Sequence, residues 1–196
     1  MKRDLIKNFL LAGLSIFFIS GHAFAGDFKL LHPKRLEFRT GYGYQYTNRT
    51  RPTNFQITPI LPGAIFPLSD SMGPSWFRGH FDWSPELFLG LFTHPYDRPI
   101  IGVTPLQFDY ALEPLGAFSP YFLIGGGFLE SNINRRETGS DWNFNLQGGI
   151  GTRLRMSEKT SLILEYRHIH ISNAGLHEDN AGLNTHTFLV GFSIQQ

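Results

Sequence analysis

The stretch WNFNLQGGIGTRLR, Trp142 to Arg155, alternates between two kinds of side chain. One set is apolar, namely Trp142, Phe144, Leu146, Ile150 and Leu154. The other set is polar or glycine, namely Asn143, Asn145, Gln147, Gly149, Gly151, Arg153 and Arg155. A period of two is that of a β-strand, and about ten residues is the length of a strand that crosses a bilayer. The stretch therefore predicts a long strand with one apolar and one polar face.

Seven further segments predict strands. The segment Phe38–Thr47 alternates in the same way, and six others follow from β-rich stretches bounded by turn residues. These six are Asn54–Leu61, Phe77–Thr93, Arg98–Leu112, Ser119–Glu130, Thr160–Ser172 and Asn184–Ile194. Eight strands are an even number that can close a barrel. The long segment from Pro62 to Trp76 is either a loop or hides part of a strand.

The alternation alone does not say which face points inward. A soluble lipid-binding barrel would have an apolar interior and would purify without detergent. The chain has 19 phenylalanines and is only 17% charged, and its strands are long enough for a bilayer. We therefore predict an all-β fold, an eight-stranded antiparallel transmembrane β-barrel, in which Glu165 and Arg167 pair in the lumen.

The N-terminus predicts export. Lys2, Arg3 and Lys7 precede an apolar run from Phe9 to Ile19, and Ala23–Ala25 reads as an A-x-A cleavage site. We expect residues 1–25 to be a cleaved signal peptide and residues 26–196 to form one barrel domain. No later segment approaches the ~20 apolar residues of a transmembrane helix.

Charge and cysteine content exclude several classes of function. Loss of residues 1–25 would change the formal net charge from +1 to −1, so nothing favours nucleic-acid binding. Cysteine is absent, which excludes a disulfide framework, a thiol nucleophile and a thiolate metal site. We predict no cofactor.

The stretch HIHISNAGLHEDNAGL, His168 to Leu183, carries the candidate chemistry. His170 and Ser172 share one strand face, and their Cα atoms are about 7 Å apart, so the imidazole can reach the hydroxyl. A serine needs such a base to become a nucleophile. Backbone N–H groups from Asn173 to Gly175, or the Asn173 amide, are candidate oxyanion donors. By itself an H-x-S pair is more often incidental.

A metal site is an alternative use of the same histidines. His168 and His170 share a strand face, His186 lies on the neighbouring predicted strand, and His177 falls between them. Three histidines can hold zinc, but no carboxylate or further supporting partner is evident. We therefore predict interfacial polar groups and no metal.

The C-terminal third resembles a known family. The stretch EYRHIHISNAGLHEDNAGLNTHTFLVGF is similar to the signature of the outer-membrane lipid A 3-O-deacylases of the PagL type. Two upstream stretches resemble the same family, SPYFLIGGGF at Ser119–Phe128 and FNLQGGIGTRLRMSEKTSLILEYRH at Phe144–His168. The resemblance spans roughly Pro85 to Phe192.

The resemblance implies an eight-stranded outer-membrane barrel that removes the ester-linked acyl chain at position 3 of lipid A. It implies a serine-esterase mechanism and a partner in the lipopolysaccharide of the outer leaflet. Carried over to this chain, His170 matches the general base and Ser172 the nucleophile. Asn173 and Gly175 match the loop that helps to stabilise the oxyanion.

The third member of the family's triad departs from the pattern. The family has a glutamate on the following strand, whereas this chain has Asn184 in the equivalent region. An asparagine can orient the imidazole by a hydrogen bond but cannot offset the charge of an imidazolium. Glu178 and Asp179 are the possible substitute acids, and Glu165 falls on the opposite strand face.

Two readings of function follow. The first is an outer-membrane serine esterase acting on lipid A, and the alternative is a non-catalytic outer-membrane barrel with a structural or adhesion role. The sequence leaves the acyl-chain specificity, the exact headgroup and the oligomeric state open.

Overall fold

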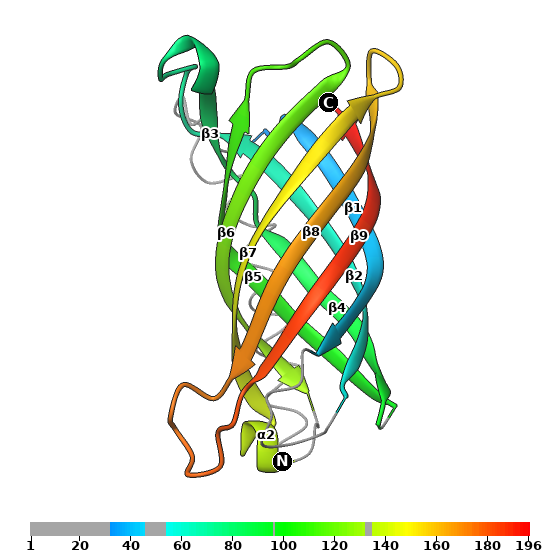
Figure 1. The fold of residues 1–196 in the computed structure, drawn as a ribbon, viewed down its shortest axis with the longest axis vertical. Coiled ribbons are helices and arrows are strands. Elements are labelled where there is room, and N and C mark those ends of the chain that lie inside the picture. The colour runs from blue at the N-terminus through cyan, green and yellow to red at the C-terminus, as the bar shows by residue number, and fades with distance from the viewer. Residues whose placement is uncertain (1–31, 46–53, 96, 132–134) are drawn as a thin grey trace. The chain divides into compact units, whose positions relative to one another are not determined.

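A closed ring of antiparallel strands makes up the fold (Figure 1). The computed structural model describes residues 32–45, 54–95, 97–131 and 135–196. The ring begins with β1 (Arg35–Gln45) and ends with β9 (Leu183–Gln195), and these two strands pair from Arg35↔Gln195 to Gln45↔Thr185. Between them lie β2 (Gln56–Pro67), β3 (Gly79–Trp83), β4 (Glu86–His94), β5 (Arg98–Leu112), β6 (Phe118–Ser131), β7 (Trp142–Arg155) and β8 (Thr160–Ser172). The prediction of an eight-stranded antiparallel barrel is confirmed, because β3 and β4 share one place in the ring.

The predicted continuous strand over Phe77–Thr93 is wrong. Phe77 ends a short 3-10 helix, η2 (Ser75–Phe77), and Ser84 and Pro85 separate β3 from β4. Pro85 has no N–H with which to bond to a neighbouring strand. The hydroxyl of Ser84 donates a hydrogen bond to Asp109 Oδ1 at 2.7 Å. The two short strands still fill one position, since both pair with β2 and with β5.

The other boundaries are close to those predicted. The bounds of β5, β7 and β8 agree with the prediction, and β6 and β9 are each one residue longer at both ends. β2 continues to Pro67, so the segment after Leu61 does hide the end of a strand. β1 begins three residues earlier than predicted, while Tyr46, Thr47 and the expected signal peptide lie outside the described residues. Within the described residues, no helix is long and apolar enough to cross a membrane.

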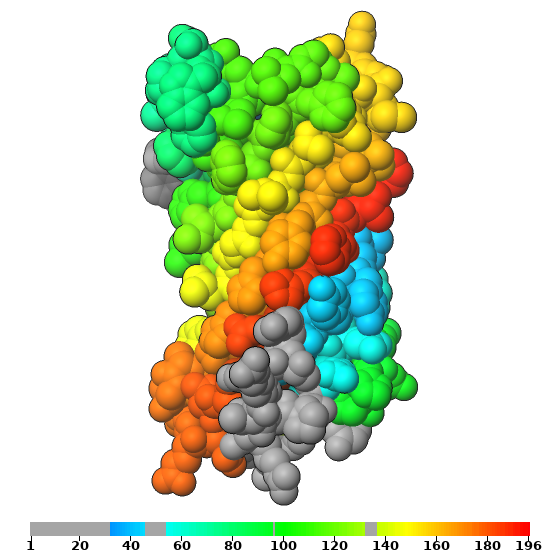
Figure 2. Space-filling view, viewed as in Figure 1, coloured from blue at the N-terminus to red at the C-terminus, as the bar shows by residue number. Residues whose placement is uncertain are grey.

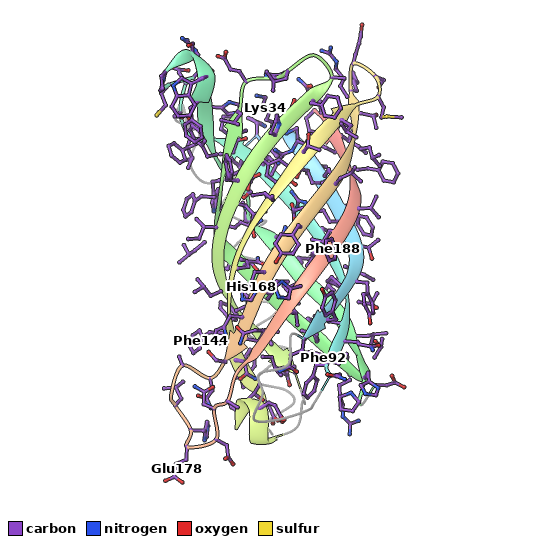
Figure 3. All side chains as sticks on the ribbon, viewed as in Figure 1. Lys34, Phe92, Phe144, His168, Glu178 and Phe188 are labelled. Atoms are coloured by element: carbon purple, nitrogen blue, oxygen red, sulfur yellow. The ribbon has the colours of Figure 1, made fainter. Side chains whose placement is uncertain are left out.

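The outer face of the ring is apolar and the inner face carries the charges. On β7 the exposed side chains include Trp142, Phe144 and Leu146, whereas Asn143 and Gln147 are buried. Exposed apolar side chains on this outer face also include Ile150, Leu164 and Phe188. Figure 2 shows one face of the molecule in space-filling form, and Figure 3 shows its side chains as sticks. This arrangement is the one expected of a bilayer barrel and is the reverse of a soluble lipid-binding barrel.

The interior is filled in layers. One buried apolar cluster lies at the end of the barrel where β8 finishes and includes Phe88, Phe92, Ile169, Ile171 and Leu183. We call this the site end. A smaller cluster, Ala111, Tyr121, Leu123 and Ile163, lies toward the other end. Along β8 the inward residues Glu165 and Arg167 fall between the two clusters, so the charged layer is closed off on both sides.

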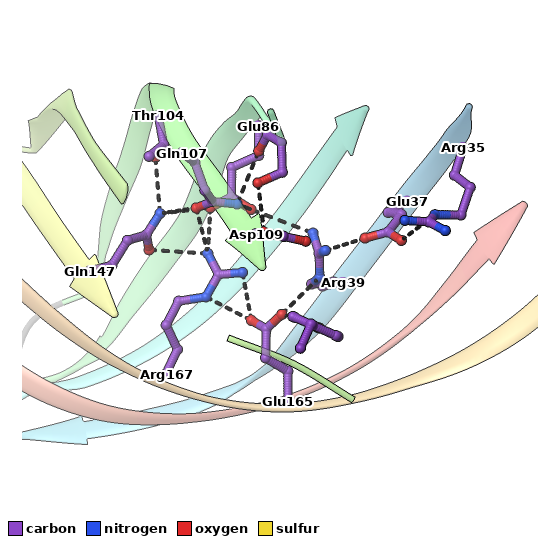
Figure 4. A network of polar contacts seen from close by, with 12 residues as sticks. Arg35, Glu37, Arg39, Glu86, Thr104, Gln107, Asp109, Gln147, Glu165 and Arg167 are labelled. Atoms are coloured by element: carbon purple, nitrogen blue, oxygen red, sulfur yellow. Dashed lines mark hydrogen bonds and ion pairs between the residues drawn. The ribbon is translucent and has the colours of Figure 1, made fainter. Parts of the chain in front are cut away.

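The charged layer is a network of ion pairs and hydrogen bonds (Figure 4). Arg167 is 0% exposed and pairs with Glu165 through Nε at 2.7 Å and with Glu86 through Nη1 at 2.5 Å. The predicted pair of Glu165 and Arg167 is therefore confirmed. Glu165 also accepts from Tyr121 Oη at 2.5 Å and pairs with Arg39 Nε at 3.1 Å.

Further members extend the network around the ring. Glu37 binds both Arg39 and Arg153, the latter through Nε at 2.6 Å. Arg153 reaches Asp109 at 2.7 Å, and Gln147 donates to Glu86 at 2.9 Å. Because buried charges are stable only when paired, each member depends on the others.

Removal of one buried charge is expected to weaken the barrel strongly. Arg167→Met leaves Glu86 and Glu165 without their closest partner, and we expect a loss of about 3–5 kcal/mol in the free energy of unfolding. Urea unfolding in detergent micelles, followed by circular dichroism, measures this loss.

Arg78→Met is the matched control. Arg78 pairs with Glu113 at 2.9 Å, but both side chains are about half exposed. Such a pair contributes less than about 1 kcal/mol. Equal losses for the two variants would contradict the role assigned to the interior network.

Candidate active site

The outward face of β8 forms a column of side chains that changes character along the strand. Its order is Leu162, Leu164, Tyr166, His168, His170 and Ser172. The apolar residues come first and the polar ones lie at the site end. His170 pairs across the ladder with Leu146 on β7 and with Asn184 on β9. The column therefore brings His170, Ser172 and Asn184 to one outer edge of the barrel.

A hydrogen bond joins His170 to Asn184. His170 Nδ1 and Asn184 Oδ1 are 2.9 Å apart. A carboxamide oxygen only accepts, so this contact requires a proton on Nδ1 and leaves Nε2 of the neutral ring with its lone pair. An imidazole held in this tautomer can take a proton at Nε2.

Ser172 is the last residue of β8 and is partly exposed. Its Cα lies about 7 Å from that of His170 along the same face. No hydrogen bond joins the Ser172 hydroxyl to the His170 ring among the described residues. Contacts between a nucleophile and its base are often open before substrate binds.

The loop after Ser172 is built around the side chain of Asn173. Asn173 is 0% exposed. Its Nδ2 donates to the carbonyl oxygens of Thr138 at 2.7 Å and Asp179 at 3.0 Å, and its Oδ1 accepts from the Gly175 N–H at 2.8 Å. The Asn173 N–H donates to Asn180 Oδ1 at 3.1 Å. Asn173 and Gly175 thus have partners inside the loop.

Ala174 differs from its neighbours in conformation. It has a φ of 55°, which is unusual for a residue other than glycine, and it is exposed. In the described part of the chain no hydrogen bond occupies its N–H, in contrast to the N–H groups of Asn173 and Gly175. Of the three backbone donors that the sequence suggested, Ala174 is the one left available.

Sequence reasoning missed the contribution of the segment before β7. The short helix α2 (Arg135–Thr138) lies beside the loop at the site end, where Gly182 N–H donates to the Glu137 carbonyl at 2.9 Å. A Cβ atom at Gly182 would lie 2.9 Å from Cε1 of His170, so a larger residue at this position would clash with the imidazole ring. The sequence signal for this loop was the tetrapeptide NAGL, which occurs at Asn173–Leu176 and again at Asn180–Leu183. Its glycines, Gly175 and Gly182, both have positive φ.

The candidate acids are not paired with the histidine. Glu178 and Asp179 are exposed in the loop, and Figure 3 shows Glu178 at its tip. No ion pair joins either carboxylate to His170 in the described residues. Glu165 points into the barrel and belongs to the charged layer.

The described residues contain no group of three or more histidines or acids placed to hold a metal ion. His168 and His186 do lie together, with ring centroids 5.4 Å apart, but His170 bonds to Asn184 instead.

A family profile matches residues 72–193, which is more than half of the chain, and its description is Lipid A 3-O-deacylase (PagL). The chain belongs to the PagL family. The match begins before the stretch that carries the resemblance in sequence and includes the whole of β3 to β8. No curated protein matches the sequence.

Solved structures agree on the fold. The crystal structure of the outer membrane enzyme PagL has a TM-score of 0.57 and 18% identity, and covers 83% of this chain and 99% of that chain. The crystal structure of Neisserial surface protein A has a TM-score of 0.51 and 10% identity, and covers 83% of this chain and 96% of that chain. These likenesses show an outer-membrane type of β-barrel.

The loop is expected to depend on Asn173. Asn173→Ala removes three hydrogen bonds and leaves the Thr138 and Asp179 carbonyls without their donor, at a cost of about 2–3 kcal/mol in local stability. Hydrogen–deuterium exchange should then accelerate across residues 173–182. Asn184→Ala is the control, since its side chain is exposed and bonds only His170 among the described residues, and exchange in the loop should stay unchanged. Unchanged exchange in Asn173→Ala would show that the loop is held by other contacts.

Proposed function

We propose that this PagL-family protein is a serine esterase of the outer membrane that removes the 3-O-linked acyl chain from lipid A. Ser172 is the nucleophile, His170 the general base and Asn184 the residue that orients the imidazole. The observation that supports this most is the His170–Asn184 hydrogen bond on the outer wall, directly beside Ser172 at the end of β8.

The reaction follows from these groups. His170 Nε2 takes the hydroxyl proton as Ser172 Oγ attacks the ester carbonyl. The tetrahedral intermediate collapses, the sugar oxygen leaves with the proton from His170, and the acyl group remains on Ser172. Water, deprotonated by His170, then attacks the acyl-enzyme and releases the fatty acid.

The developing oxyanion needs a donor. The candidate donor is the N–H of Ala174, an exposed residue two positions after Ser172. Its left-handed backbone is held by the Asn173 side chain, which binds the next N–H, that of Gly175. A fixed donor of this kind stabilises a transition state more than a mobile one, because it need not reorganise.

Asn184 sets a limit on the rate. It stands where the resemblance implies a glutamate, and its amide orients the ring without neutralising the imidazolium that forms during attack. We therefore expect a functional but slower esterase.

The position of the site determines how substrate arrives. The interior is filled by the charged layer and its flanking apolar clusters, and the three residues face outward. The acyl ester must then come from the lipid itself. With both termini periplasmic after export and removal of residues 1–25, the end of β8 meets the outer leaflet, where lipopolysaccharide resides.

Mass spectrometry of lipid A from cells expressing each variant tests the proposal. Wild type should remove one 3-linked acyl chain, while Ser172→Ala and His170→Ala should lower the rate by about 10³-fold or more. An unchanged lipid A profile, with wild-type protein verified as folded in the outer membrane, would favour the non-catalytic barrel.

The same measurement tests how much Asn184 contributes to the rate of deacylation. Asn184→Ala should slow deacylation about tenfold, the effect of one lost orienting hydrogen bond, and Asn184→Glu should restore or exceed the wild-type rate. Equal rates of deacylation with asparagine, alanine and glutamate at position 184 would exclude Asn184 from the mechanism.

A further inference from the structure

The segment between β2 and β3, residues 68–78, folds back onto the outer wall at the end of the barrel opposite the site end (Figure 1). Defined contacts hold it there. Met72 and Gly79 exchange two backbone hydrogen bonds, at 2.7 and 3.0 Å. The hydroxyl of Tyr110 on β5 donates to the carbonyl oxygen of Phe77 at 2.8 Å. The segment is therefore a fixed part of the wall.

An apolar groove with a volume of about 440 Å³ lies between this segment and the strands behind it. Its lining combines three strand residues with three from the segment, namely Phe81, Tyr110, Phe122, Met72, Gly73 and Phe77. The ring of Phe77 stacks on Tyr110 with centroids 5.1 Å apart and lies 6.1 Å from the ring of Phe122. Among these six residues the side-chain hydroxyl is that of Tyr110, and Phe77 already accepts its hydrogen bond. The lining side chains therefore offer packing surface instead of hydrogen bonds.

The groove continues the outer face of the barrel. Phe81 on β3, Tyr110 on β5 and Phe122 on β6 are direct partners across the strands, and the same row runs on to Ile150 on β7. Phe81, Phe122 and Ile150 are exposed on the outer face. Because the outer face of a membrane barrel meets lipid, the groove opens toward the bilayer.

The groove also lies near one edge of the bilayer. Phe122 is nine residues before Ser131, where β6 finishes at the site end. Nine residues span about 30 Å along a strand and, at a tilt of about 40°, about 23 Å along the barrel axis. The apolar band of such a barrel is about 25 Å tall. Trp76 is 82% exposed, and the half-exposed pair of Arg78 and Glu113 adjoins it, as expected where a bilayer meets water.

We propose that this groove binds one acyl chain of a phospholipid from the leaflet opposite the site end, the periplasmic leaflet. An acyl chain brings no hydrogen-bonding group into the groove. A peptide segment would bring backbone N–H and C=O groups that the lining side chains cannot pair. The site end meets the outer leaflet, where lipopolysaccharide resides, so phospholipid is the source of the chain. This inference does not depend on the esterase chemistry.

Native mass spectrometry of the protein purified from outer membranes tests the proposal, with dioleoyl phosphatidylethanolamine in detergent micelles as the probe. Wild type should retain one phospholipid per chain. Phe77→Ser removes the ring on one side of the groove, and Met72→Trp fills its space, so each should weaken retention about tenfold. Because one variant opens the groove and the other fills it, a folding defect in one of them does not decide the outcome.

Phe128→Ser is the matched control. Phe128 is an exposed outward residue on the same strand as Phe122, but it lies outside the groove. Its replacement should leave retention at the wild-type level. In vesicles of phosphatidylethanolamine and phosphatidylglycerol, a phospholipid that carries a diazirine in its acyl chain should form photoadducts concentrated on peptides that contain Phe77 and Phe81.

Equal retention by wild type and both groove variants, or no phospholipid on the wild type, would overturn the proposal. Photoadducts spread evenly along the outer wall would do the same. A wild-type dimer that Met72→Trp separates would replace the lipid with a second copy of the chain. None of these readouts involves Ser172, so failure here and failure of the proposed esterase are distinguishable.

Discussion

The pairing of charges inside the barrel is the constraint on which the rest of the structure depends. Arg167 is enclosed by Glu86 and Glu165, and the same carboxylates reach Arg39. Each charge would be prohibitively costly alone in this interior, and each is stable only because strands far apart in the sequence bring partners to it. The network therefore ties β1, β4 and β8 together across the interior, which its side chains and the two flanking apolar clusters fill.

A filled interior leaves the outer wall as the place for the chemistry that we propose. Side chains on a strand alternate, so β8 contributes Glu165 and Arg167 inward and His168, His170 and Ser172 outward. The inward residues hold the strand in place, and the ladder to β9 then sets Asn184 beside His170. Rigid strands hold a reacting pair more precisely than a loop does, and the lipid substrate that we propose is itself part of the surrounding membrane.

The sequence predicted most of this where the signal is local. A period of two over Trp142–Arg155 and Thr160–Ser172 was enough to find β7 and β8, and the same period put His170 and Ser172 on one face. The break at Ser84 and Pro85 was missed, because the aromatic and apolar residues on either side continue the strand pattern across it.

Contacts between distant segments could not be predicted. The hydrogen bond from Asn173 to the Thr138 carbonyl joins two loops that come together only when the ring closes. Its consequence is chemical as well as structural, since it occupies the Asn173 amide that the sequence suggested as an oxyanion donor. The partner of His170 was identifiable as Asn184 from the family resemblance, but the contact between Nδ1 of the ring and Oδ1 of the amide required the coordinates.

Covalent labelling is a direct test of Ser172 as the nucleophile. Protein in detergent micelles is treated with a fluorophosphonate carried on an acyl chain, which reacts with activated serine hydroxyls, and the adduct is mapped by peptide mass spectrometry. We expect one adduct, on Ser172, that is lost in Ser172→Ala and strongly slowed in His170→Ala. An adduct on another residue, or none on folded wild-type protein, would contradict an outward-facing serine esterase at the end of β8.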